Sequence, residues 1–258
     1  MVARLPRRER TTAPLEKERE WLPRLAPLLP VPVTLPLANG RPAESYACEW
    51  SVYRWLEGEP ATRERTPDLG RVAADLARFV AALRTVDPTG GPPPGEHNFH
   101  RGVPLAARDA ETRAAIAALD GELDVGAATA AWEAALRAPA WQHAPVWLHG
   151  DLSPGNLLVD EDGLCGVADF GCLGVGDPAC DLMIAWTLSS GESRDAYRRA
   201  LAVDDASWWR GRGWALSWAL IALPYYLRTN PAIAREARHT IAEVLEDFRA
   251  PAAGRLPS

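Results

Sequence analysis

The stretch HGDLSPGN at residues 149–156, followed by DFG at residues 169–171, decides the fold of this chain. Between the two motifs lie an apolar run, a polar turn at residues 160–163 and a second apolar run. Two apolar runs joined by a short polar turn are typical of a β-hairpin. The sequence therefore predicts a hairpin whose open end carries both polar motifs.

The register of this hairpin brings two polar side chains together. We expect Val159 to pair with Leu164 across the turn. That register places Asp169 opposite Pro154 and two positions away from Asn156. Side chains two positions apart across a ladder are roughly 7 Å from each other. A single cation could therefore bridge Asn156 and Asp169.

The residue types at these positions suit phosphoryl transfer. Mg²⁺ takes oxygen ligands and usually binds one or two carboxylates plus substrate phosphates, whose charge it neutralises during the transfer. Asp151 follows an apolar strand and would face the acceptor hydroxyl and take its proton. Any one of these Asp or Asn residues alone would more often form a turn. Together they follow the order of the protein-kinase motif set, in which only the Arg is replaced, here by Gly150.

Composition narrows the class of protein. The chain has 258 residues, 47% of them hydrophobic, which suits a folded protein with a sizeable core. With a formal net charge of −6, the chain lacks the excess of basic residues that nucleic-acid binding usually needs, so we expect no nucleic-acid partner. The longest apolar stretch, residues 214–227, contains Ser217 and Pro224 and is too short to span a membrane. The four cysteines lack the paired spacing of zinc sites or disulfide frameworks, so we expect a cytoplasmic protein.

Hydrophobic periodicity predicts an α+β fold in two lobes. The N-terminal lobe, residues 1–57, should contain a strand at 2–5, a helix at 14–26 and two further strands joined by a tight Asn39-Gly40 turn. The C-terminal lobe, residues 58–258, should be mainly helical and should contain the hairpin. The helices expected in this lobe span residues 69–83, 108–119, 127–137, 179–190, 193–201, 205–227 and 231–248.

The segment 146–182 resembles the aminoglycoside phosphotransferases and their kinase-like small-molecule relatives. Its HGD motif stands where protein kinases have HRD, and the continuation GVGDPACDL at residues 174–182 is also similar to theirs. A weaker resemblance extends to residues 50–60 and 16–25. The resemblance implies a protein-kinase-like two-lobe fold with a truncated N-terminal sheet lobe, and phosphoryl transfer from ATP or GTP.

The resemblance also implies roles for individual residues of the larger lobe. Asp151 would be the catalytic base, and Asn156 and Asp169 would be the Mg²⁺ ligands. Asp181 would be a buried carboxylate that steadies the catalytic loop, and His149 would be structural.

The smaller lobe should supply the nucleotide contacts. The end of its last strand looks like the hinge of the family, where backbone groups of Arg54 and Leu56 would meet the nucleotide base; a strand entering a linker has the same pattern. Relatives pair a strand lysine with a helix glutamate. Here Arg4 stands in the place of that lysine, with Glu18 or its neighbour Glu16 as the expected partner, and the planar fork of an arginine can also hold phosphate oxygens.

Two strands that cover the phosphates in relatives have no sequence to occupy before residue 2. We therefore expect that the chain begins downstream of the natural start, that it is truncated, or that it is a degenerate relative. Because Asp151, Asn156 and Asp169 are all retained, a degenerate relative that has lost its activity is the less favoured of these alternatives.

Charge points to a class of acceptor. Residues 144–210 contain 11 Asp plus Glu and 4 Lys plus Arg, and such a negative field would attract a cationic substrate. Catalytic carboxylates and the polar turn already account for much of this excess.

The predicted function is a kinase-like small-molecule O-phosphotransferase that uses Mg²⁺ and ATP or GTP. The expected acceptor is a hydroxyl of an aminoglycoside-type antibiotic, which would make the protein a resistance enzyme. One alternative is a metabolite kinase that acts on choline, a sugar or an amino alcohol. Another is a non-catalytic nucleotide-binding module, because the phosphate-covering strands are missing. The motifs do not distinguish ATP from GTP, and they carry no information on oligomeric state.

Overall fold

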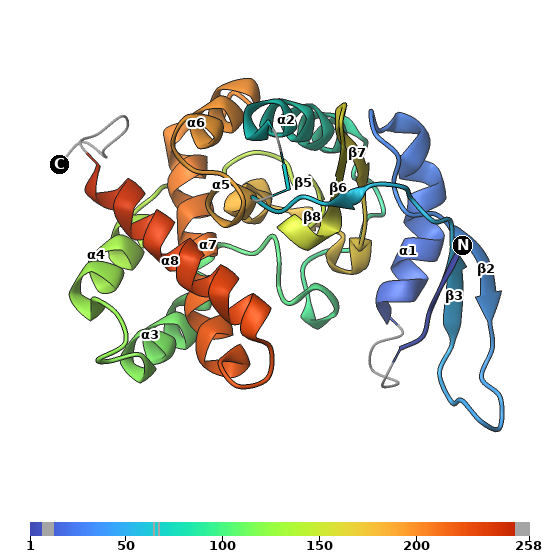
Figure 1. Cartoon of the computed structure of the whole chain (residues 1–258), viewed down its shortest axis with the longest axis horizontal. Coiled ribbons are helices and arrows are strands. Elements are labelled where there is room, and N and C mark those ends of the chain that lie inside the picture. Colours follow the sequence, from blue (N-terminus) through green and yellow to red (C-terminus); the bar gives the residue numbers. More distant parts are fainter. Residues whose placement is uncertain (7–12, 64, 67, 251–258) are drawn as a thin grey trace.

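The computed structural model describes residues 1–6, 13–63, 65–66 and 68–250. Figure 1 shows a small part with one helix, α1 (Ala13–Leu25), and a sheet, drawn in blue beside a larger and mainly helical part. This is the predicted α+β two-lobe fold. None of the helices in these ranges combines the length and the apolar character needed to cross a membrane.

The small sheet is antiparallel and has the strand order β1-β3-β2. Strand β1 (Val2–Arg4) and strand β2 (Pro36–Gly40) both pair with β3 (Trp50–Tyr53). The predicted helix at 14–26 is α1, and it buries three leucines that share one face at helical spacing. These residues are Leu15, Leu22 and Leu25.

The predicted Asn39-Gly40 turn is wrong, because both residues lie inside β2. The chain reverses direction farther along, where Ala43 and Tyr46 pair with each other. Gly40 lies opposite Trp50, and a Cβ atom at Gly40 would be 1.8 Å from the indole ring. This glycine is therefore required by the close approach of a large ring and not by a turn.

Two further small sheets lie in the larger part. Strand β6 (Leu157–Asp160) and strand β7 (Gly163–Val167) form the predicted hairpin, and β4 (Glu59–Pro60) pairs with the outer edge of β6. Strand β5 (Val146–Leu148) pairs with β8 (Gly174–Gly176). Strands β4 and β8 were not predicted from the sequence, because two or three residues are too few to show an alternating pattern.

The chain passes from the first sheet to the second between Tyr53 and Glu59. The boundary proposed after residue 57 falls within this crossing, and it stays a proposal.

Helices make up the rest of the larger part. They are α2 (Leu69–Thr85), α3 (Asp109–Ala118), α4 (Val125–Leu136), α6 (Gly191–Ala200), α7 (Asp205–Tyr226) and α8 (Pro231–Arg249). The expected helix at 179–190 is instead a 3₁₀ helix, η7 (Pro178–Met183), followed by the short α5 (Ile184–Thr187). Residues 178–187 are all buried, so packing from every side, and not an amphipathic period, determines their backbone.

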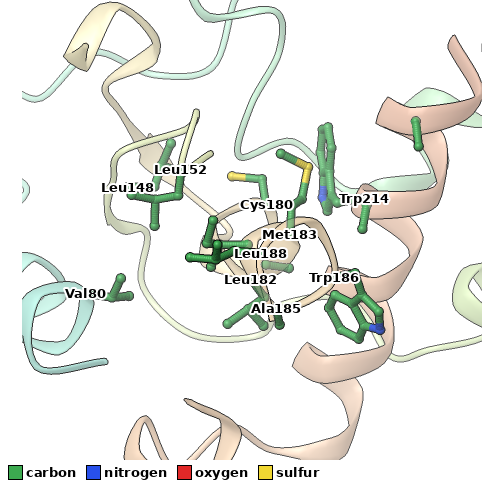
Figure 2. Packing of buried hydrophobic residues seen from close by; sticks show 14 of the residues in the cluster. Val80, Leu148, Leu152, Cys180, Leu182, Met183, Ala185, Trp186, Leu188 and Trp214 are labelled. Atoms are coloured by element: carbon green, nitrogen blue, oxygen red, sulfur yellow. The ribbon is translucent and has the colours of Figure 1, made fainter. Parts of the chain in front are cut away.

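The core is built around this buried segment. Figure 2 shows Leu182, Met183 and Trp186 packed together with Trp214 of α7 nearby. The Trp186 and Trp214 side chains are completely buried. Because η7 is enclosed in this way, the polar side chains that it carries are held rigidly beneath the loop that follows β5.

Candidate active site

The loop after β5 depends on a glycine. Gly150 has φ = 82°, a left-handed conformation that side chains with a Cβ rarely adopt. A Cβ atom here would also lie 2.4 Å from the carbonyl oxygen of Cys172. Both facts explain why this loop carries Gly at the position where protein kinases carry Arg.

A buried carboxylate holds the same loop from below. Asp181 is fully buried in η7 and accepts hydrogen bonds from the backbone N–H groups of His149 (2.8 Å) and Gly150 (2.7 Å). Burial raises the pKa of Asp181, while the nearby His149 and the two backbone bonds act in the opposite direction. The carboxylate therefore fixes the backbone that leads to Asp151.

The His149 side chain connects the loop to the end of the hairpin. Its Nδ1 atom accepts from the backbone N–H of Asp151 (3.2 Å), so its Nε2–H donates to the carbonyl of Ala168 (3.0 Å). The ring also packs against Phe170, with centroids 4.5 Å apart. Both ring nitrogens are thus used in positioning the chain, which suits a structural histidine.

Asn156 and Asp151 are in direct contact. The Asn156 amide Nδ2 donates to the backbone carbonyl of Asp151 (2.8 Å) and to its carboxylate oxygen Oδ2 (3.3 Å). Within the described part of the chain, no group donates to Asn156 Oδ1. The amide is therefore oriented with its oxygen available to a ligand.

Asp169 lies one position closer to Asn156 than expected. Val159 does pair with Leu164, but a bulge between Leu158 and Val159 shifts the register of the pairs before it. Ala168 then donates its backbone N–H to the carbonyl of Asn156 at 2.8 Å. The predicted pairing of Asp169 with Pro154 is wrong for this reason, and Asp169 directly follows the partner of Asn156.

Asp169 is also joined to the small lobe. Its Oδ1 accepts from Arg4 Nη2 at 2.7 Å, and Arg4 Nη1 donates to Glu18 Oε1 at 3.0 Å. Glu18 is completely buried and also accepts from the Tyr53 hydroxyl at 2.5 Å. Burial raises the pKa of Glu18 even though Arg4 acts to lower it. Burial lowers the pKa of Arg4, but the charges of Glu18 and Asp169 outweigh it and the net shift is upward.

The arrangement suits a magnesium ion that is shared with phosphates. Asp169 Oδ1 is engaged by Arg4 and by the Gly171 N–H, while no described residue bonds to Oδ2. Asn156 Oδ1 and Asp169 Oδ2 are hard oxygen donors, the type that Mg²⁺ prefers. The described residues contain no group of three or more His, Cys, Asp or Glu that could hold a metal. Mg²⁺ in phosphoryl-transfer sites typically binds one or two carboxylates plus substrate phosphates, and the two oxygens here fit that pattern.

Comparison with known proteins identifies the family. The sequence profile of the phosphotransferase enzyme family (APH) matches residues 1–215. The chain belongs to this family. No curated protein matches the sequence of this phosphotransferase.

Solved structures share its fold. The GDP and kanamycin complex of APH(2")-IIia is 20% identical with a TM-score of 0.72, over 95% of this chain and 86% of that chain. The GDP complex of wild-type aminoglycoside 2'-phosphotransferase-IIIa is 19% identical with a TM-score of 0.71, over 96% and 86%. The macrolide 2'-phosphotransferase MphH from Brachybacterium faecium, as apoenzyme, is 26% identical with a TM-score of 0.60, over 97% and 85%.

The expected hinge of this phosphotransferase has one backbone group already in use. The Arg54 N–H donates to the carbonyl of Leu35 at 2.9 Å. The carbonyl of Arg54 and the backbone of Leu56 are what remain for a nucleotide base. The intervening Trp55 is 55% exposed.

One acidic side chain near Asp151, Glu236 of α8, was not predicted from the sequence. Its Oε1 atom is buried and has no hydrogen-bond partner among the described residues. Burial and, after it, the negative charge of Asp151 raise the pKa of Glu236 to about 7. In the sequence, Glu236 is one of several charged residues on an amphipathic helix, and only the tertiary fold brings it within electrostatic reach of Asp151.

Proposed function

We propose that this phosphotransferase transfers the γ-phosphate of ATP or GTP to a hydroxyl of a small molecule, with Asp151 as the catalytic base. The observation that carries the proposal is the connected set of Asp151, Asn156 and Asp169. Asn156 bonds to the carboxylate of Asp151 and is paired through its backbone with the residue before Asp169.

Each residue of the set has a role that follows from its contacts. Asp151 would orient the acceptor hydroxyl and take its proton, since it lies on a loop held by backbone hydrogen bonds. Asn156 and Asp169 would hold Mg²⁺, which neutralises phosphate charge when bound. Arg4 would bind phosphate oxygens with its planar fork while Glu18 keeps it in place.

The nucleotide is proposed to bind between the lobes. Arg4 and Glu18 come from the small lobe, while Asn156 and Asp169 come from the large one, so phosphates held by both must lie between them. Backbone groups at Arg54 and Leu56 would receive the base. Related folds described as GDP and ADP complexes support a purine nucleotide.

The acceptor is proposed to carry an amine as well as the reacting hydroxyl. Glu236 places near Asp151 a carboxyl whose Oε1 has no hydrogen-bond partner among the described residues, and a bound ammonium group would supply one. Similar solved structures described as complexes with kanamycin, gentamicin and streptomycin support an aminoglycoside-type compound as the acceptor.

The proposal is tested by turnover and by one substitution. Purified protein with Mg²⁺ and γ-labelled ATP or GTP is offered aminoglycosides, macrolides, choline, sugars and amino alcohols. With the acceptor that is used, Asp151→Asn should lower kcat by roughly 10²–10⁴-fold, because the proton acceptor is lost. The folding of the variant is checked by thermal unfolding.

Asp160→Asn is the matched control, since Asp160 lies on the exposed turn of the same hairpin. It should retain full turnover. Full turnover in Asp151→Asn would defeat the assignment of the base. Nucleotide binding without transfer to any acceptor would favour the non-catalytic module, and transfer to choline or a sugar alone would favour a metabolite kinase.

A further inference from the structure

The chain contains a single lysine, Lys17, whose side chain reaches from the small lobe to Gly171 and Leu173 of the large lobe. It lies on α1, one residue before Glu18. Its Nζ atom donates to the backbone carbonyls of Gly171 (2.9 Å) and Leu173 (3.0 Å). It also lies 2.7 Å from Nδ1 of His97. One ammonium group therefore joins α1 to two segments that are distant in sequence.

The His97 contact is a hydrogen bond from the ammonium group to a neutral ring. His97 Nε2 lies 2.8 Å from the carbonyl of Pro93, which can only accept, so Nε2 carries the proton. Nδ1 is then an acceptor for Lys17. The ammonium group thus has four acceptors within hydrogen-bond distance: the carbonyls of Gly171, Leu173 and, at 3.4 Å, His97, and the imidazole Nδ1 of His97.

The carbonyls of Gly171 and Leu173 lie at the end of the turn that carries Asp169. Gly171 belongs to the 3₁₀ turn Phe170–Cys172, and Leu173 directly follows it. Asp169 begins this turn with φ = 58°, a left-handed conformation that costs a non-glycine residue free energy. Such a conformation persists only where surrounding contacts impose it. Lys17 supplies two of these contacts, both to backbone atoms of the turn.

The same turn of α1 therefore holds Asp169 in two ways. Glu18 acts through Arg4 on the carboxylate, and Lys17 acts directly on the backbone that follows. No carboxylate lies within hydrogen-bond distance of Nζ among the described residues. Burial lowers the pKa of Lys17 to about 8, with Cys172 and Glu18 acting in the opposite direction. Among the described residues, this partly buried cation is hydrogen-bonded only to neutral groups.

We infer that Lys17 is a positioning residue, which fixes the backbone of the turn after Asp169 so that this carboxylate is presented to the metal. The inference rests on the proposed function in one respect, that Asp169 is a Mg²⁺ ligand. It assigns Lys17 no contact with nucleotide, metal or acceptor.

The test compares Lys17→Met with Arg19→Met. Arg19 is a matched control, because it is a basic residue on the same helix that holds the other side of the small lobe, through Ser51 and the carbonyl of Trp50. In protein without ligands, hydrogen exchange of the peptide that covers residues 169–173 should become roughly tenfold faster in Lys17→Met. It should stay unchanged in Arg19→Met, whatever either variant does to the melting temperature.

A second readout measures the metal. Binding of Mn²⁺ in the presence of ATP, followed by electron paramagnetic resonance, should weaken by roughly tenfold in Lys17→Met and stay unchanged in Arg19→Met. ATP affinity without metal should stay unchanged in both variants. Equal effects of the two substitutions, or no effect of Lys17→Met on the turn, would overturn the inference.

Two controls keep the result interpretable. If the wild type binds no Mn²⁺ with ATP, the proposed function fails, while hydrogen exchange still decides whether Lys17 fixes the turn. If Lys17→Met does not fold, reductive dimethylation of the folded wild type removes two N–H donors and keeps the charge. The exchange of the turn should then accelerate as well, and unchanged exchange after complete modification would contradict the inference.

Discussion

At the scale of single residues, the carboxyl groups of the site differ in whether they have hydrogen-bond partners among the described residues. Asp181 accepts two backbone hydrogen bonds, and Glu18 accepts from Arg4 and Tyr53. Glu236 differs from them, because a buried carboxylate oxygen without a partner carries a desolvation penalty. Such a group is stable only if it keeps its proton or meets a cation. We therefore expect Glu236 to respond both to pH and to the acceptor.

Glu236→Gln should flatten the pH dependence of stability. The pKa of Glu236 in the folded protein is about 7 against an ordinary value of 4.5, so between these values the folded state holds a proton that the unfolded chain has released. Stability is therefore lost as the pH rises from 4.5 towards 7 and is fully present below this range. Allowing for solvent around the side chain, the glutamine variant should be about 1–2 kcal/mol more stable at pH 8.

Urea unfolding at pH 5 and pH 8 measures this difference. Glu246→Gln, on the exposed face of the same helix, is the control and should leave the pH dependence unchanged. In turnover assays Glu236→Gln should raise KM for an amine-bearing acceptor and leave KM for ATP unchanged. If the free energy of unfolding changes equally between pH 5 and pH 8 in the wild type and in Glu236→Gln, the Glu236 carboxyl does not titrate in this range.

At the scale of elements, the loop that carries Asp151 depends on η7 as well as on its own glycine. The loop has a left-handed glycine and is bonded to Asp181 at its first two residues, His149 and Gly150. Asp181 is held in turn by the packing of η7 in the core that contains Trp186 and Trp214, seen in Figure 2. A defect in this short helix should therefore damage the active site without touching any residue that contacts substrate.

Asp181→Asn should destabilise the protein by about 1–3 kcal/mol, as when a buried hydrogen-bond donor loses its acceptor. The amide replaces one acceptor oxygen with a donor that faces a backbone N–H, so one buried N–H loses its partner. Chemical denaturation measures the change, and turnover of the folded fraction should fall because Asp151 is no longer held. Asp195→Asn on the exposed face of α6 is the control. An unfolding free energy equal to that of the wild type would contradict the proposed role of η7.

At the scale of the whole molecule, the site is shared between the lobes. Figure 1 shows α1 and the blue sheet beside the helical body, and the contacts of Arg4 and Lys17 connect the two at the turn after Asp169. A nucleotide held by both lobes should therefore stabilise the entire chain by mass action.

MgATP at about 100 times its dissociation constant should raise the melting temperature by roughly 5–10 °C, from a linkage contribution of about 2.7 kcal/mol. Thermal unfolding with ATP alone, with Mg²⁺ alone and with both measures the shift. Asp151→Asn should show the full shift because it lacks only the base. Asp169→Asn should lose the part that depends on Mg²⁺, and an undiminished shift in that variant would remove Asp169 from the proposed metal site.

Much of the fold was predictable, because long periodic segments carry their own signal. The helix α2 and the β6–β7 hairpin were predicted and are confirmed. The predicted pairing of Val159 with Leu164 in the hairpin is confirmed as well. The strands β4 and β8 were not predictable, since each is defined only by its partner. The prediction of a turn at Asn39-Gly40 was wrong because a glycine can serve a turn or a close contact equally well. The sequence alone does not distinguish these two uses.

The sequence by itself determined the family, the fold class and the candidate residues at 149–156 and 169–171, since these depend on motif order and hydrophobic period, which are local properties of the chain. Only the tertiary structure decided the bulge that moves Asp169 next to Asn156, the attachment of Lys17 to the turn, and the place of Glu236. These depend on residues far apart in the chain meeting in a packed interior. The physical reason is that the free energy of a buried charge is determined by its partners and its burial, and neither is a property of neighbours in sequence.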